Sequence, residues 1–175
     1  MNSTTKLLAS VLAVCFLSLS LAAQSALAVM IADEPSGFRG NQWGASPADC
    51  ASLRFVTGQG VTSTGRRVDL YDRSTVGITL NGVPLTRIRY RFLDNHLESV
   101  QLSYEGRANR DKLLQLMEER YGRLTPGEHK LVGRAEWDGY ETVVDLSYNT
   151  ETGRGSLWFI STILNRDFTW PGPGL

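Results

Sequence analysis

Three arginines at alternate positions, Arg87, Arg89 and Arg91, are the residues whose type and spacing most favour a binding role. Apolar residues stand between them, and this alternation is typical of a half-buried β-strand. On such a strand the three side chains would lie about 7 Å apart on one face. Because guanidinium groups bind carboxylates, phosphates and sulfated glycans, the ladder predicts a site for an anionic ligand. The alternative is a solvated sheet face whose charges discourage aggregation.

The four tryptophans offer a second kind of contact surface. Trp137 and Trp158 fall in predicted strands, where core packing is the default, and Trp43 is large enough to attach the N-terminal segment to a core. Trp170 belongs to the C-terminal sequence FTWPGPGL, whose prolines and glycines exclude regular structure. A tryptophan in such a segment is hard to bury, so we expect Trp170 to contribute to ligand binding.

Cys50 is the candidate reactive thiol. It follows a predicted helix start, and a helix N-terminus lowers the pKa of a thiol and favours the nucleophilic thiolate. Two alternatives are a small buried residue that packs beside Leu53 and a disulfide between two chains.

The two histidines do not complete a recognisable catalytic or metal motif. His96 lies in a predicted turn and His129 precedes a predicted strand, and neither has the spacing of a zinc site. No acid pair is spaced as a glycosidase couple, although Glu136 and Asp145 could meet in space. The segment Gly58-x-Gly60 lacks the remainder of a phosphate-binding loop. We therefore predict no catalytic residue, no metal site and no cofactor.

Two helices are predicted to support these residues, over 46–53 and 109–121. Ser46 and Asn109 suit their N-caps, and Gly122 suits the end of the second helix. Strand patterns cover two stretches within 83–104 and the segments 54–56, 68–71, 76–80, 130–137, 142–148 and 156–163.

The two stretches within 83–104 are predicted to form a hairpin whose register can be tested. A three-residue turn at 94–96 would place Tyr90 opposite Val100, with apolar pairs on one face and arginines opposite Ser or Gln on the other. Hairpin spacing predicts an antiparallel sheet with both helices on one face. The predicted fold class is therefore a single α+β domain over 29–175.

The N-terminus resembles a secretory signal peptide over 1–28. Lys6 precedes an apolar run, and Ala26-Leu27-Ala28 fits a cleavage site. The run is too short for a comfortable membrane span, and no later segment is longer and more apolar. We expect a periplasmic or secreted protein with no transmembrane segment.

The composition excludes several classes of protein. With 18 basic and 18 acidic residues among 175 and an apolar fraction of 42%, the chain is neither disordered nor a strongly basic nucleic-acid binder. We expect a monomer or weak homodimer.

The segment from Gly44 to Cys50 resembles the Gly-x-Ser/Thr helix start of small envelope modules such as the lipoprotein BamE and the β-lactamase-inhibitor proteins. The segment from Phe38 to Gly44 is similar to a Phe-Arg-Gly-x-x-Trp-Gly sequence in uncharacterised exported proteins of proteobacteria. The first resemblance implies an antiparallel sheet that works by protein–protein contact. The matching residues cover about a tenth of the chain, lack the lipoprotein cysteine motif and imply no catalytic residue.

The leading hypothesis is a non-enzymatic module of the bacterial envelope that binds another envelope protein or a small anionic ligand. The alternatives are a small hydrolase that uses dispersed groups such as Cys50 or His129, and a purely structural envelope protein.

Overall fold

The computed structural model describes residues 31, 33–73, 77–125, 130–131 and 133–165. The predicted signal peptide and Trp170 lie outside these residues. Among the described residues, no helix is both long enough and apolar enough to cross a membrane.

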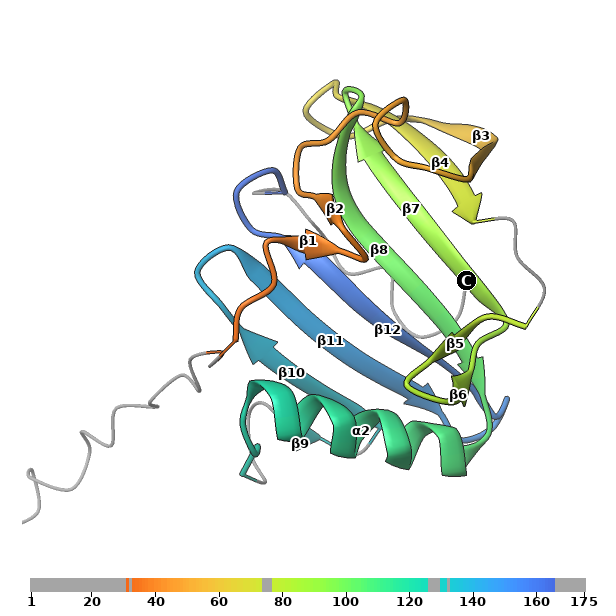
Figure 1. Ribbon diagram of the computed structural model, residues 1–175, viewed down its shortest axis with the longest axis vertical. Helices are drawn as coiled ribbons and strands as arrows, with labels where there is room; N and C mark the ends of the chain where they lie inside the picture. Colours follow the sequence, from red (N-terminus) through yellow and green to blue (C-terminus); the bar gives the residue numbers. More distant parts are fainter. Residues whose placement is uncertain (1–30, 32, 74–76, 126–129, 132, 166–175) are drawn as a thin grey trace, which may run out of the picture.

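The molecule is built on one antiparallel sheet of eight strands (Figure 1). In their order across the sheet, the strands are β3 (Leu53–Val61), β4 (Arg67–Arg73), β7 (Arg87–Leu93), β8 (His96–Glu105), β12 (Arg154–Ser161), β11 (Thr142–Asn149), β10 (Arg134–Asp138) and β9 (Lys130–Leu131). Two short hairpins, β1 (Gly37–Phe38) with β2 (Asn41–Gln42) and β5 (Thr79–Leu80) with β6 (Val83–Pro84), form separate small sheets. One helix, α2 (Arg107–Tyr121), follows β8.

The prediction of an α+β domain with two helices is wrong, because the described part of the chain is mostly strand and contains one helix. Residues 47–52 form turns instead of the first predicted helix. Ser46 donates to Asp49 Oδ2 from its hydroxyl at 2.7 Å and from its backbone N–H at 3.1 Å, but Ser46 does not cap a helix. However, Ser52 adopts a left-handed conformation with φ 63°, and β3 begins at the next residue. The segment is too short to offset the cost of starting a helix.

The second predicted helix is present, but it begins two residues earlier than expected. Its N-cap is Gly106, whereas the predicted cap, Asn109, lies in the first turn and donates from its side chain to the carbonyl of Glu105 at 2.8 Å. Gly122 ends the helix as predicted, with φ 108° and its N–H bonded to the carbonyl of Glu118.

The β7–β8 hairpin confirms the central register and corrects the turn. Tyr90 pairs with Val100 as predicted, but Leu93 pairs with His96 across a two-residue turn. The two turn residues, Asp94 and Asn95, have φ 48° and 68°, which is the left-handed geometry of a tight hairpin turn. The register shift next to Arg91 absorbs the difference as a bulge.

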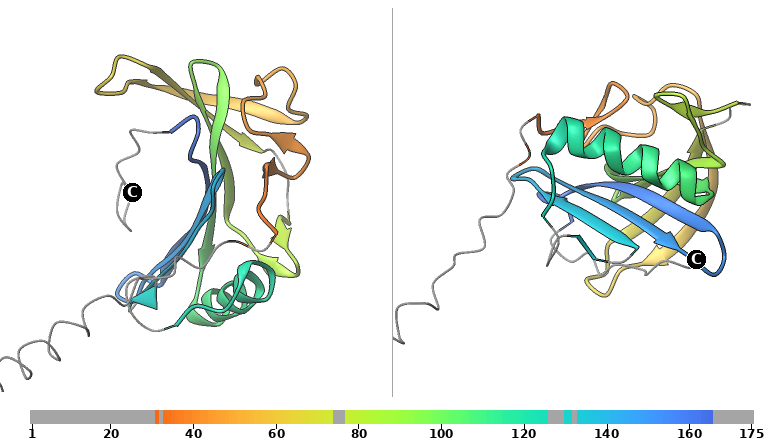
Figure 2. Two further views of the ribbon diagram at one scale, coloured as in Figure 1. Left: turned by 90° about the vertical axis from the view of Figure 1, so that its left-hand side faces the viewer. Right: turned by 90° about the horizontal axis from the view of Figure 1, so that it is seen from below.

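The main hydrophobic core lies between the sheet and the elements on one of its faces. Figure 2 shows α2 and both short hairpins on this side. The sheet contributes side chains such as Ile88, Tyr90 and Trp137, and the helix contributes Leu113 and Met117. We call this side of the sheet the core face and the opposite side the polar face.

Candidate functional site

The polar face carries the three arginines of the predicted ladder. Arg87, Arg89 and Arg91 are half-buried on β7, whereas the alternating Ile88 and Tyr90 are fully buried on the core face. The predicted partners are confirmed, since the three arginines pair in register with Ser103, Gln101 and Ser99 of β8. The fold therefore places the ladder as the sequence predicts.

Two arginines of the ladder are already bound to carboxylates of the protein. Arg89 donates to both oxygens of Asp72 on the neighbouring β4, at 2.7 and 2.9 Å. Arg91 donates to Glu98 at 2.6 Å, and Glu98 also accepts from Ser99 Oγ. Glu98 is fully buried, and burial raises the pKa of its carboxyl despite the charge of Arg91. These two guanidinium groups hold the sheet together.

Arg87 differs from Arg89 and Arg91 because no carboxylate among the described residues forms an ion pair with it. It makes no salt bridge among the described residues, and its Nε atom is buried without a hydrogen-bond partner. Burial lowers the pKa of its guanidinium and the adjacent charge of Arg89 lowers it further, while the charge of Asp72 partly opposes this shift. Arg87 is thus the member of the ladder whose guanidinium group is not bound to a carboxylate of the described chain.

Three serines continue from Arg87 across the polar face, and we call them the serine row. Ser103 on β8 pairs with Ser156 on β12, which pairs with Ser147 on β11. Ser147 and Ser156 are joined through their hydroxyls at 3.0 Å, and Trp158 Nε1 donates to Ser156 Oγ at 3.1 Å. Within the described chain, the hydroxyl of Ser103 takes part in no hydrogen bond. The row therefore presents one unengaged hydroxyl directly opposite Arg87.

The far end of the serine row meets a carboxyl pair. Arg134 pairs in register with Ser147 and donates to Asp145 at 2.5 Å and to Glu136. Glu136 and Asp145 are cross-strand partners, so the two acids do meet in space. Burial raises the pKa of Asp145 to about 7, and the adjacent Glu136 carboxylate, which can accept the proton, contributes to this shift. Because Asp145 is fully buried, it is a poor general acid for an external substrate.

Access to the polar face changes along β7. At the end of the strand near the hairpin turn, Leu93 packs with Val68 and Leu70 in a small buried apolar cluster. At the other end, Arg87 and Ser103 are half-buried, and the side chain of Arg134 is 40% exposed. A ligand can therefore reach the end of the polar face that holds the serine row.

The other predicted site residues do not join this region. Cys50 is buried, and burial raises the pKa of its thiol, with Asp49 adding to the rise. A raised pKa leaves the thiol protonated at neutral pH, which opposes the nucleophile hypothesis. His96 is exposed in the β7–β8 turn, where Nδ1 lies 2.8 Å from the carbonyl oxygen of Asp94. His129 lies outside the described residues, and the described ones contain no cluster that could hold a metal ion.

The described tryptophans are structural. Trp137 is fully buried on the core face, and Trp43 donates from Nε1 to Thr142 Oγ1 at 2.8 Å. Trp158 lies on the polar face, but only 8% of its surface is exposed. These three side chains do not form an open aromatic platform.

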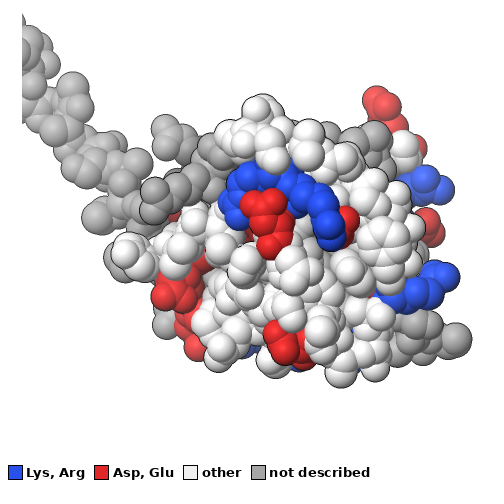
Figure 3. All heavy atoms as spheres, turned by 90° about the horizontal axis from the view of Figure 1, so that it is seen from above, with Lys and Arg blue, Asp and Glu red and all other residues white. Residues whose placement is uncertain are grey.

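The end of the molecule near the β7–β8 turn carries charges of both signs. Figure 3 shows basic and acidic side chains in contact there, surrounded by uncharged surface. Arg66 donates to Asp94 at 2.7 Å, and the backbone of Arg67 donates to the same carboxylate. These bonds lower the pKa of Asp94. The arginines at this end are paired and do not resemble Arg87.

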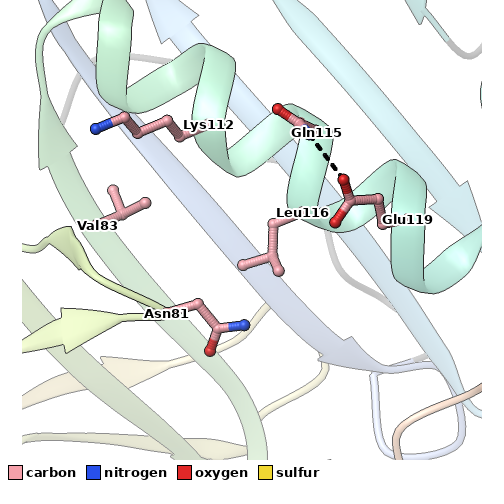
Figure 4. A pocket seen from close by; sticks show the side chains of 6 residues that line it. All are labelled: Asn81, Val83, Lys112, Gln115, Leu116 and Glu119. Atoms are coloured by element: carbon pink, nitrogen blue, oxygen red, sulfur yellow. Dashed lines mark hydrogen bonds between the residues drawn. The ribbon is translucent and has the colours of Figure 1, made fainter.

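A concave region lies away from the polar face, between α2 and the β5–β6 hairpin (Figure 4). Its volume is about 190 Å³, below the 300 Å³ or more that is usual for small-molecule sites. Leu116 is its apolar centre, and Gln115 donates to Glu119 at 2.7 Å along its wall. We therefore favour the polar face as the functional site.

Comparisons of the chain with protein-family models, with curated proteins and with solved structures gave no match. The resemblance to small envelope modules thus stays a prediction from short sequence segments.

Proposed function

We propose that the protein is an exported, non-enzymatic binding module that recognises a protein or a small anionic ligand at the open end of its polar face. One observation carries the proposal. Arg89, Arg91 and Arg134 are bound to carboxylates of the chain, whereas Arg87 and the facing Ser103 hydroxyl have no hydrogen-bond partner among the described residues. Unengaged donors on half-buried side chains favour recognition of an acceptor group from outside.

The hydrolase alternative has less support. Of its candidate groups, Cys50 is buried with a raised pKa and His129 lies outside the described residues, while the carboxyl of Asp145 is shielded from solvent. Hydrolysis needs a nucleophile or an activated water next to a reachable acid or base. Export and an envelope location are supported by the N-terminal sequence pattern.

Site-specific photo-crosslinking in the producing cells tests the binding function. A benzoylphenylalanine at Ser156 places the crosslinker in the serine row, and one at Gln115 places it beside the groove of α2 as a control. We expect one discrete adduct from position 156 and none from position 115. If position 156 gave no adduct with protein or small molecule, or if adducts formed only at position 115, the polar face would not be the binding surface.

A further inference from the structure

The polar face contains an arginine, Arg87, that makes no ion pair within the described structure, although the charge of Asp72 acts on it. A guanidinium group has five N–H donors, and buried donors in folded proteins are nearly always paired. In Arg87 the Nε donor is buried and unpaired within the described structure. The nearest carboxylate of β4, Asp72, is already bound by both oxygens to Arg89. The Nε donor of Arg87 is therefore left without an acceptor among the described residues.

The geometry around Arg87 suits a small group that accepts several hydrogen bonds. Arg87 and Ser103 are direct cross-strand partners, which places their Cβ atoms about 5 Å apart. One acceptor group can contact the guanidinium and the hydroxyl together at this spacing. The neighbouring Arg89 adds positive potential, while the carboxylates of Asp145 and Glu136 are held at the other end of the row by Arg134.

We infer that Arg87 and Ser103 form a subsite for one oxyanion group, a carboxylate or a phosphate, of the ligand. This inference rests on the proposed function and deepens it, because it states which chemical group of the ligand this face recognises. Arg87 supplies the positive charge and adjacent N–H donors of one guanidinium group, and Ser103 supplies an O–H donor. Arg89 and Arg91 position the strand and do not contact the anion, since their guanidinium groups are bound to Asp72 and Glu98.

Amide NMR titrations of the full chain with sodium phosphate and with sodium acetate, each against sodium chloride at equal ionic strength, test the subsite. We expect saturable shifts at residues 87, 103 and 156 with a dissociation constant in about the millimolar range, since one small group makes few contacts. The two salts show whether the subsite prefers a phosphate or a carboxylate group, because the preferred anion binds more tightly. Equal shifts with chloride would overturn the inference.

Matched variants separate a specific site from general charge effects. Arg87→Gln is expected to weaken anion binding at least about tenfold, and Ser103→Ala a few-fold, because each removes a donor. Arg120→Gln removes an exposed arginine of α2 on the other side of the sheet and is expected to leave the affinity unchanged. Arg87→Lys retains the charge and checks that loss of binding is not loss of folding. Unchanged affinity in Arg87→Gln, or an equal loss in Arg120→Gln, would refute the subsite.

The two experiments fail in different ways. If the subsite is wrong, the anion titration fails while the crosslinker at position 156 still captures a partner. If the proposed function is wrong, position 156 captures nothing, whatever the titration shows.

Discussion

The two faces of the eight-stranded sheet are held by different forces, although the same strands build both. On the core face, side chains such as Ile88 and Trp137 are fully buried against α2 and the short hairpins. On the polar face, Arg89 and Arg91 are bound to individual carboxylates. Apolar packing tolerates many neighbours, whereas ion pairing requires one specific partner for each group. Within the ladder Arg87 is the arginine that lacks such a partner, and the hydroxyl of Tyr90 is a buried unpaired group on the core face.

The largest expected loss of stability comes from removing a buried aromatic ring from the core face. Trp137 is fully buried, and its Nε1 donates to the carbonyl of Gly122, the residue that ends α2, at 2.8 Å. Trp137→Ala removes the ring and this bond, so we expect the free energy of unfolding to fall by about 3–5 kcal/mol in urea titrations. The matched control is Tyr140→Ala, since Tyr140 is 82% exposed, and its cost should stay within about 0.5 kcal/mol. Similar costs for both aromatics would refute the assignment of the core face.

The next largest expected effect is a pH dependence of the stability, which arises from Asp145 on the polar face. The pKa of Asp145 is raised from 3.8 to about 7 in the folded state, so the folded protein holds this proton more tightly than the unfolded chain does. The stability that this proton contributes is fully present below about pH 4 and is lost as the pH rises to about 7.

Relative to Asp145→Asn, the wild type should therefore lose about 2–4 kcal/mol of unfolding free energy between pH 4 and pH 8. Urea titrations of both proteins across this range measure the difference. Glu136→Gln removes the neighbouring carboxylate and should move the midpoint to lower pH. Parallel pH profiles of wild type and Asp145→Asn would show that the carboxyl titrates normally.

The smallest expected change in stability comes from removing the hydroxyl of either of two buried tyrosines of the core face. Tyr104 donates from its hydroxyl to the carbonyl of Ser147 at 2.7 Å, whereas the hydroxyl of Tyr90 is buried without a partner. Tyr104→Phe should therefore cost about 1–2 kcal/mol, and Tyr90→Phe should be neutral or stabilising by up to about 1 kcal/mol. Thermal unfolding of the two variants measures this contrast. A larger loss from Tyr90→Phe than from Tyr104→Phe would contradict it.

Local alternation was sufficient to predict the faces of β7 and β8 and the pairing of Tyr90 with Val100. It could not predict the partners of the arginines. Asp72 reaches Arg89 through the register of β4 with β7, which depends on a connection that contains the β5–β6 hairpin. Glu98 reaches Arg91 next to a bulge, and a bulge shifts the alternation on which the prediction depended.

The first predicted helix shows that local sequence signals can also predict an element that does not form. Ser46 and Asp49 are hydrogen-bonded to each other, yet the left-handed Ser52 and the start of β3 leave the segment as turns without a helix. Tertiary pairing of β3 with β4 outweighs the local preference there. Such competition depends on contacts distant in sequence, so the fold class could not be settled from helix signals alone.

The ends of the sheet have a consequence for how the protein behaves at high concentration. β3 exposes nearly all of its nine residues along one edge, and its pairing with β4 is interrupted by two register shifts. The opposite edge, β9, has two residues. Irregular and very short outer strands present few consecutive backbone groups to a neighbouring chain. The register shifts at one edge and the shortness of the other therefore limit edge-to-edge pairing between copies of the chain, even though neither edge is closed.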